Sequence, residues 1–475
     1  MVVTRFGRPS CRALALRSRW APPVMALVAI SMIIGGCSQP ANDAGEISVE
    51  GAAASEPVAE AVFGPDDWPW WRGSNRNGIA QGPPVPTTWS ETENVIWKTP
   101  LSGRGHSSPT VVADSIYLAT ADDDAQVQSV ICLNRNDGHQ RWKTDIHTGG
   151  FPGADGVHRE NTNASCTLAC DGERVFVAFL NGGHIWATAL DLAGEQVWQQ
   201  DIGSFTPDFG YAPSPLIYKS LVIFAADNKG GGYLAALHRG TGNFGWRKPR
   251  KANSSYSSPA LYTLDGKDQL LISGCDLVAS YDPNTGDELW SVKGTTEATC
   301  GTMVASPGEN VVFASGGYPG SETLCVRADG SGEVLWRNRL KAYVPSMMLF
   351  ENHLYLIDGE RGIGSCLDAK TGTQTWQARF GRKVRSSPVL SGEHIYWPNA
   401  DGTTHVFRAS PTRFERVAEN QLGDETYATP TICGGRLYLR VADSSSGTRQ
   451  ETLYCIGNRD SEPDSVTIRE PAAIQ

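Results

Sequence analysis

Residues 282–290 read DPNTGDELW, and they contain the pattern that decides the fold: a glycine, three further residues and a tryptophan. Six such pairs follow one another along the chain: Gly138/Trp142, Gly194/Trp198, Gly242/Trp246, Gly286/Trp290, Gly332/Trp336 and Gly372/Trp376. Their successive tryptophans are 56, 48, 44, 46 and 40 residues apart. This period is typical of the four-stranded blades of a β-propeller.

Short runs with alternating apolar and polar residues precede each tryptophan. Residues 107–120 (SSPTVVADSIYLAT) and 386–399 (SSPVLSGEHIYWPN) are examples, and turn residues separate the runs. Period-two alternation of this length predicts antiparallel strands, and long amphipathic helices are absent. Eight units begin with a similar segment, near Pro109, Thr167, Pro215, Pro259, Thr302, Pro345, Pro388 and Pro430. The sequence therefore predicts an all-β fold, an eight-bladed propeller of four-stranded antiparallel blades.

The last blade lacks a strand in its own repeat, because the eighth unit stops at Asn458. Residues 93–101 (ENVIWKTPL) match the missing strand and place Trp97 in the tryptophan column. We therefore expect the N-terminal strand to close the last blade. The seventh unit has residues 409–421 in place of a tryptophan strand. The column residues expected to dock neighbouring blades are Trp97, Trp142, Trp198, Trp246, Trp290, Trp336 and Trp376.

The repeat resembles the pyrroloquinoline-quinone-type propeller family, to which BamB-like proteins also belong. The resemblance is carried by DPNTGDELW, by DAKTGTQTW at 368–376 and by HRGTGNFGW at 238–246, and it covers about residues 89–458. It implies either a quinoprotein dehydrogenase, using the quinone with calcium, or an envelope lipoprotein of the β-barrel assembly machinery, which binds no quinone. Residues 67–80 (DWPWWRGSNRNGIA) are similar to a leader found in many bacterial members.

The first 36 residues read as a bacterial lipoprotein signal peptide. Five arginines precede an apolar run at 21–34, and the small residues Gly35 and Gly36 stand before Cys37. This order predicts export and lipidation of Cys37; the alternative is an ordinary secretory signal with a chance cysteine. Ser38, in place of an aspartate, favours the periplasmic side of the outer membrane over the inner membrane.

The chain beyond the signal divides into four expected parts. Residues 37–67 form an acidic disordered tether with seven acids and no base, and residues 68–88 form a leader that packs on the propeller. The propeller spans 89–458, and 459–475 is a disordered tail. Loss of the signal changes the formal net charge from −10 to −15, because five arginines and no acid are removed. This charge argues against nucleic acid as a partner, and the lipid is the expected membrane contact.

Several of the 11 cysteines occupy one repeat position. Cys132, Cys325, Cys366 and Cys455 stand where other repeats have Ala189, Ala236 and Ser280. A position shared by alanine, serine and cysteine is a small buried site, so we expect packing rather than metal or redox chemistry there. Nine cysteines remain after removal of Cys11 and lipidation of Cys37, and their disulfide connectivity is open.

Residues directly before the opening segments should surround the propeller axis on one face. They are His106, Tyr211, Tyr256, Thr299, Tyr343, Arg385 and Tyr427. Tyrosine and arginine combine contact area with hydrogen bonding, so His106, Tyr211, Tyr256, Tyr343, Arg385 and Tyr427 form a candidate face for binding a protein or peptide. An equally weighted alternative is that the tyrosines plug the channel and bond backbone carbonyls.

Two enzymatic readings receive less support. A quinoprotein would need a tryptophan platform, a carboxylate base and calcium ligands. In many dehydrogenases of the family two adjacent cysteines cover the quinone, and this chain has no adjacent cysteines. A hydrolytic or metal site could combine the insertion at 151–165, which carries His158, Glu160 and Asn161, with His106 and Glu297, but these residues lack ligand spacing. We therefore expect no catalytic residues, no metal and no cofactor, and a monomeric binding protein.

Overall fold

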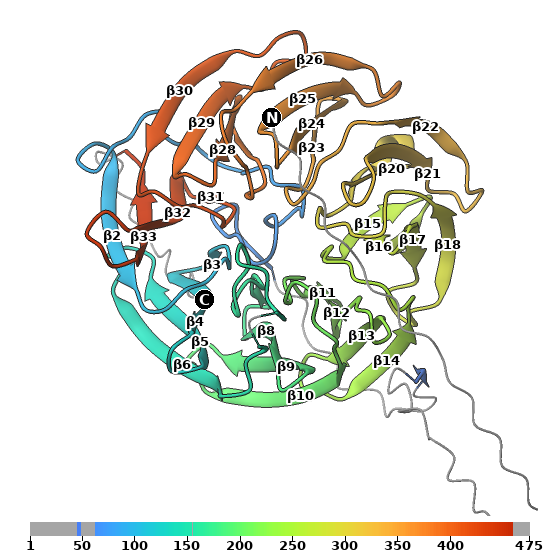
Figure 1. Cartoon of the computed structure of the whole chain (residues 1–475), viewed down its shortest axis with the longest axis horizontal. Helices are drawn as coiled ribbons and strands as arrows, with labels where there is room; N and C mark the ends of the chain where they lie inside the picture. The colour runs from blue at the N-terminus through green and yellow to red at the C-terminus, as the bar shows by residue number, and fades with distance from the viewer. Residues whose placement is uncertain (1–44, 49–61, 154, 459–475) are drawn as a thin grey trace, which may run out of the picture. The chain divides into compact units, whose positions relative to one another are not determined.

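The computed structural model describes residues 45–48, 62–153 and 155–458. Eight antiparallel sheets follow one another around a ring, which confirms the predicted eight-bladed propeller (Figure 1). The only helix in the described part is a single 3-10 turn, η1 (Pro307–Glu309). No helix in these residues is long and apolar enough to cross a membrane. Cys37 and the predicted signal, most of the tether and the tail lie outside the described residues.

The first four blades each consist of four consecutive strands, numbered outward from the axis. Blade 1 contains β3 (Thr110–Val112), β4 (Ser115–Asp122), β5 (Val127–Asn134) and β6 (Gln140–Thr148). Blade 2 contains β7 (Ala169–Cys170), β8 (Arg174–Asn181), β9 (His184–Asp191) and β10 (Gln196–Ser204). Blade 3 contains β11 (Leu216–Tyr218), β12 (Leu221–Ala225), β13 (Tyr233–His238) and β14 (Phe244–Pro249), with β1 (Ile47–Ser48) paired to the outer edge. Blade 4 contains β15 (Ala260–Leu264), β16 (Lys267–Gly274), β17 (Leu277–Tyr281) and β18 (Glu288–Lys293).

The remaining blades repeat this order. Blade 5 contains β19 (Val304–Ser306), β20 (Val311–Gly316), β21 (Glu322–Arg327) and β22 (Val334–Asn338). Blade 6 contains β23 (Met348–Phe350), β24 (His353–Asp358), β25 (Ile363–Asp368) and β26 (Gln374–Arg379). Blade 7 contains β27 (Val389–Ser391), β28 (His394–Pro398), β29 (Thr403–Arg408) and β30 (Arg416–Gln421). Blade 8 contains β31 (Thr431–Cys433), β32 (Arg436–Asp443), β33 (Gln450–Ile456) and β2 (Val95–Leu101).

Blade 8 joins the two ends of the repeat region, as the sequence predicts. Its outer strand β2 pairs antiparallel with β33, so that Trp97 lies opposite Cys455. The indole nitrogen of Trp97 then donates a hydrogen bond to the carbonyl of Arg135 in blade 1, at 3.1 Å. The ring is thus closed by β2, which precedes all eight repeat units in the chain, so the last blade is complete.

The glycine and the tryptophan of the repeat meet at the blade junctions. The glycine of one blade packs on the tryptophan ring of the preceding blade: a Cβ built on Gly242 would lie 2.7 Å from the Trp198 ring, and one on Gly286 would lie 2.5 Å from the Trp246 ring. Such distances leave no room for any side chain, which explains why the repeat requires glycine. The small column residues face the tryptophan from within the same blade, as in the Cys132–Trp142 pair.

Trp290 is an exception to this arrangement. Six column tryptophans donate to a backbone carbonyl of the next blade, whereas Trp290 donates to Oε1 of Gln269 in its own blade, at 2.8 Å. The next column glycine, Gly332, accordingly has no tryptophan against it, and the nearest atom to its built Cβ is a methyl of Val292 at 3.5 Å. The junction between blades 4 and 5 therefore closes without the glycine–tryptophan contact.

The leader segment crosses the centre of the ring, where Figure 1 shows it in blue. Trp68 forms a bridge with Val111 of blade 1, and Ile79 forms one with Leu390 of blade 7. Between them, the indole nitrogen of Trp71 donates to the Thr302 hydroxyl at 2.8 Å. These contacts join the leader to the inner strands of blades 1 and 7 and to Thr302 before blade 5, so the leader belongs to the folded ring rather than to the tether.

Candidate functional site

A ring of hydroxyl groups surrounds the propeller axis. Each opening segment places one serine or threonine there: Ser108, Thr167, Ser214, Ser258, Thr302, Ser346, Ser387 and Thr429. At six junctions the hydroxyl accepts the backbone N–H of the equivalent residue in the preceding blade, at 2.8–3.2 Å. This hydroxyl ring ties the inner strands together, and it explains why each segment begins with serine or threonine.

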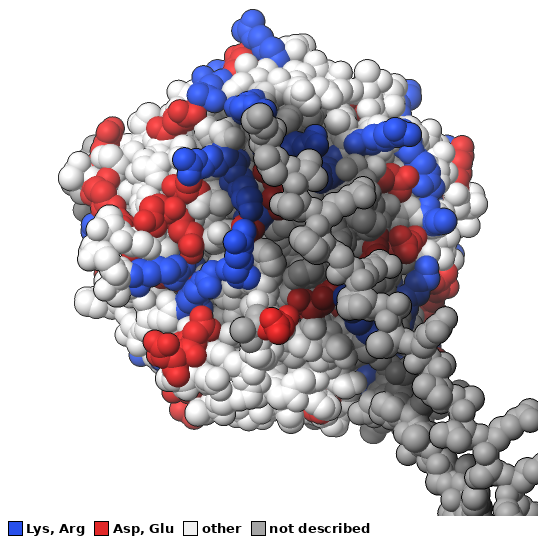
Figure 2. Space-filling model, viewed as in Figure 1, with Lys and Arg blue, Asp and Glu red and all other residues white. Residues whose placement is uncertain are grey.

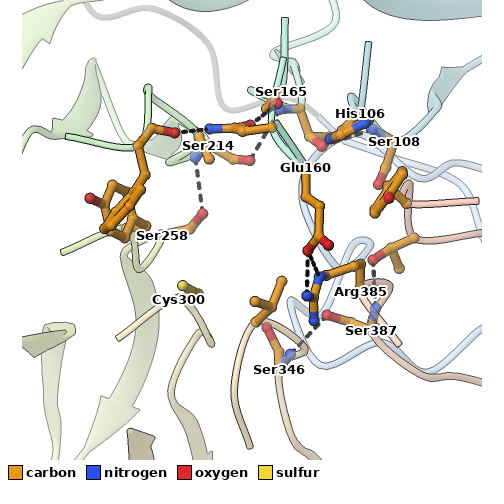
Figure 3. Close-up of a pocket in the computed structure, with 18 of the residues that line it drawn as sticks. His106, Ser108, Glu160, Ser165, Ser214, Ser258, Cys300, Ser346, Arg385 and Ser387 are labelled. Atoms are coloured by element: carbon orange, nitrogen blue, oxygen red, sulfur yellow. Dashed lines mark hydrogen bonds and ion pairs between the residues drawn. The ribbon is translucent and has the colours of Figure 1, made fainter. Parts of the chain in front are cut away.

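Seven of these eight residues, all except Thr302, line a cavity of about 310 Å³ together with Trp71 (Figure 3). Above the ring, the walls are aromatic and polar, and residues from all eight blades contribute. His106 and Tyr427 stack with ring centroids 4.5 Å apart, and Phe209 lies 6.1 Å from Tyr256. The cavity can therefore accept a ligand that has apolar surface together with hydrogen-bonding groups.

Five of the six candidate face residues line this cavity: His106, Tyr256, Tyr343, Arg385 and Tyr427. Tyr211 does not, because it is buried and its hydroxyl donates to the carbonyl of Ala225 at 3.1 Å. Thr299 is also buried and lies outside the lining. Tyr211 thus bonds a backbone carbonyl without entering the cavity, while the other three tyrosines line the cavity.

The insertion between blades 1 and 2 extends into the cavity from one side. Its Glu160 points toward Arg385, which precedes β27 of blade 7 (Figure 3). Oε1 of Glu160 lies 2.7 Å from Nζ of Lys383, and Oε2 accepts from both Nε and Nη2 of Arg385. Arg385 also lies 2.6 Å from Glu360. These four side chains form a charge cluster with two positive and two negative groups.

The charge cluster controls the ionisation of Glu160. Burial by itself would raise the pKa of Glu160, but the hydrogen bonds and positive charges of Lys383 and Arg385 lower it from 4.5 to about 2. His106 behaves differently, because burial and the nearby charge of Arg104 lower its pKa well below 6.5. At neutral pH the cavity therefore contains a neutral imidazole and an ionised carboxylate. The Nε2 atom of His106 is buried and has no hydrogen-bond partner among the described residues.

The side chains in the cavity do not fit a calcium-bound quinone. Its two carboxylates, Glu160 and Glu360, already pair with Lys383 and Arg385. The amide of Asn161 donates to the Phe209 carbonyl and accepts from the Thr162 N–H. Within the described ranges, no three His, Cys, Asp or Glu side chains gather as metal ligands, and Glu297 of the hydrolytic reading lies outside the cavity lining.

Cysteine chemistry does not supply a site either. The nine cysteines of the described residues are unpaired thiols, and Cys132, Cys325, Cys366 and Cys455 are buried, as the repeat position predicts. Cys300 lines the cavity, but burial raises the pKa of its thiol to about 12. At neutral pH the thiol is therefore protonated and a poor nucleophile.

Sequence reasoning missed two parts of this site. The hydroxyl ring was detectable, because all eight opening segments carry serine or threonine in one column. The pairing of Glu160 with Arg385 was not, because 225 residues separate them and no sequence pattern links them. Figure 2 shows basic and acidic side chains intermingled on the face in view, so net charge also marks no single binding patch.

Comparison with known proteins gives a consistent family and fold. The family model described as outer membrane protein assembly factor BamB matches residues 77–145, 124–260 and 275–410. Outer membrane protein assembly factor BamB of Burkholderia pseudomallei is 24% identical over 389 residues, covering 76% of this chain and 90% of that protein. The crystal structure of BamB from Moraxella catarrhalis superposes with a TM-score of 0.55 at 16% identity, covering 76% of this chain and 99% of that one. Quinohemoprotein alcohol dehydrogenase of Comamonas testosteroni has a TM-score of 0.57 at 14% identity, covering 86% and 83% of the two chains.

Proposed function

Because this chain belongs to the family of the outer membrane protein assembly factor BamB, we propose that it is a non-enzymatic binding protein of the cell envelope. In this proposal it recognises a protein or peptide through the propeller face on which the central cavity opens. The observation that carries the proposal is the cavity itself, whose walls combine aromatic rings with hydrogen-bonding and charged groups. Tyr256, Tyr343, Tyr427 and Arg385 supply those groups.

The proposal places the chain on the periplasmic side of the outer membrane, as a monomer held by a lipid on Cys37. The name of the Burkholderia relative supports outer-membrane assembly as the process in which the partner takes part. A ring closed by β2 is suited to a scaffold, because it holds the loops of its eight blades at fixed positions relative to one another. Binding through those loops requires no cofactor.

Site-specific photocrosslinking in the cell envelope tests the proposal. We expect a crosslinking amino acid at Tyr256 or Tyr427 to capture a discrete protein or peptide partner. The matched control carries the same group at Leu289, an exposed residue of the outer strand β18. Capture from Leu289 but not from the cavity residues would move the binding surface to the outside of the ring and contradict the proposal.

The quinoprotein alternative is tested in the same preparation. The chain is incubated with pyrroloquinoline quinone and calcium, passed through gel filtration and heated. We expect no co-eluting quinone absorbance and no rise in melting temperature, because the cavity carboxylates are already paired. A stoichiometric quinone complex that oxidises an alcohol or a sugar would overturn the non-enzymatic assignment.

A further inference from the structure

Arg385 and Lys383 together have the geometry of a carboxylate-binding site. Two nitrogens of the Arg385 guanidinium converge on one oxygen of Glu160, and Nζ of Lys383 lies 2.7 Å from the other oxygen. Arg385 is 9% exposed, and its Nη2 is also held by Glu360, so the guanidinium is oriented in advance. Such a preformed two-cation arrangement is suited to bind a planar carboxylate.

The carboxylate bound there comes from the chain's own insertion rather than from the blades. Glu160 lies between blades 1 and 2, whereas both cations lie between blades 6 and 7, before β27. The Glu160 side chain retains 16% exposure, so solvent reaches the ion pair from the cavity. Glu160 thus occupies the site from the same space that a ligand would enter.

We propose that Arg385 and Lys383 bind a carboxylate of a peptide partner, and that Glu160 occupies this site as an internal substitute until the partner displaces it. This inference rests on the proposed function and names the chemistry that the cavity would recognise. Exchange of one carboxylate for another keeps the charge cluster neutral, whereas a phosphate dianion would add a negative charge beside Glu360. A singly charged peptide carboxylate is therefore favoured.

The walls around this site define the residues that flank the carboxylate. Tyr343 and Tyr427 line the same cavity as Arg385, and His106 stacks on Tyr427. Nε2 of His106, which lines the cavity, is buried and has no hydrogen-bond partner among the described residues. These surfaces fit an acidic residue or a chain terminus that has aromatic residues beside it. The ligand's aromatic rings would pack against Tyr343 and Tyr427, and its carboxylate would bind Arg385 and Lys383.

Peptide binding to the full chain in detergent tests this inference by fluorescence anisotropy. The probes are labelled Gly-Phe-Asp-Phe-Gly with a C-terminal amide, its Asn counterpart, and the Asn peptide with a free C-terminus. The first two distinguish a side-chain carboxylate from an amide, and the third identifies a terminal carboxylate. We expect at least one carboxylate peptide to bind more tightly than the Asn amide.

The decisive variant is Glu160→Gln, which removes the internal carboxylate and leaves the charge cluster with one net positive charge. We expect it to tighten the carboxylate peptide about tenfold and to leave the Asn amide unchanged. Arg385→Gln and Lys383→Gln should reduce the difference between the peptides; Lys383 is 42% exposed, so its variant should fold. The matched control is Glu425→Gln, which breaks the pair with Arg449 outside the cavity lining and should change nothing.

Two results would overturn the inference. One is a folded Glu160→Gln protein that binds the carboxylate peptide no better than the wild type does. The other is equal binding of the carboxylate and amide peptides by the wild type and by Lys383→Gln. If crosslinking from Tyr427 still captures a partner in either case, the proposed function stands and only its carboxylate chemistry fails.

Discussion

Replacement of Gly242 by alanine measures how strongly the glycine–tryptophan contact holds two blades together. Gly242 has a φ of +74°, and a Cβ at this position would lie 2.7 Å from the Trp198 ring. Trp198 is 8% exposed, and its indole nitrogen donates to the Arg239 carbonyl at 2.8 Å. The ring must therefore move into packed surroundings and lose this hydrogen bond.

The loss of unfolding free energy expected for Gly242→Ala is the sum of three contributions. A left-handed alanine costs about 1–2 kcal/mol of unfolding free energy, overpacking costs about 1–3 kcal/mol, and the lost hydrogen bond costs about 1 kcal/mol. We therefore expect Gly242→Ala to destabilise the protein by about 3–6 kcal/mol. Gly332→Ala is the matched control, because Gly332 has a φ of +72° but its nearest neighbour, a Val292 methyl, is 3.5 Å from the built Cβ. It should cost only the backbone contribution of about 1–2 kcal/mol.

The assay is urea unfolding followed by tryptophan fluorescence, with free energies compared at equal m values. Equal destabilisation by the two alanines would refute the reasoning. The repeat glycine would then be required only for its backbone conformation, and the contact with the tryptophan of the neighbouring blade would contribute nothing measurable.

Three further predictions concern the anchor, the ring closure and the charge cluster. A palmitate analogue should label the wild type but not Cys37→Ala, and equal labelling of both would remove the lipoprotein assignment. A variant that begins at residue 62 should melt at nearly the same temperature as the full mature chain. A variant that begins after Leu101 lacks β2 and the leader, and it should melt at a much lower temperature because the edge of β33 is exposed. Equal melting temperatures for the two variants would contradict closure by β2. The pKa of Glu160 is lowered from 4.5 to about 2, so its stabilising contribution is present above pH 4.5 and is lost as the pH falls toward 2. Acid titration of unfolding should therefore show a smaller loss of stability in that window for Glu160→Gln than for the wild type, and identical titration curves would argue against the ion pair.

The architecture could be derived from the sequence, because its determinants are local and repeated. Each blade repeats the same alternation of apolar and polar residues, the same turn residues and the same glycine–tryptophan spacing. A unit that departs from the pattern is therefore still identified as a blade by its neighbours. The closure of the eighth blade by the N-terminal strand could also be predicted, because residues 93–101 match the strand that the eighth unit lacks. Blade 7 shows the strength of the pattern: β30 forms without a column tryptophan, and Phe414 packs against Trp376 of the preceding blade.

The site required the tertiary structure, because it is made by loops that meet across the ring. The sequence placed Tyr211 and Tyr256 in one column, yet Tyr211 turns into the protein to bond Ala225 while Tyr256 lines the cavity. The repeat column therefore does not fix the direction of a side chain in the loop that precedes each blade. The contact between Glu160 and Arg385 depends on ring closure, which brings the loop before blade 7 within reach of the insertion after blade 1. Strand pattern is therefore a property of the sequence, whereas the chemistry at the axis arises only where distant segments converge.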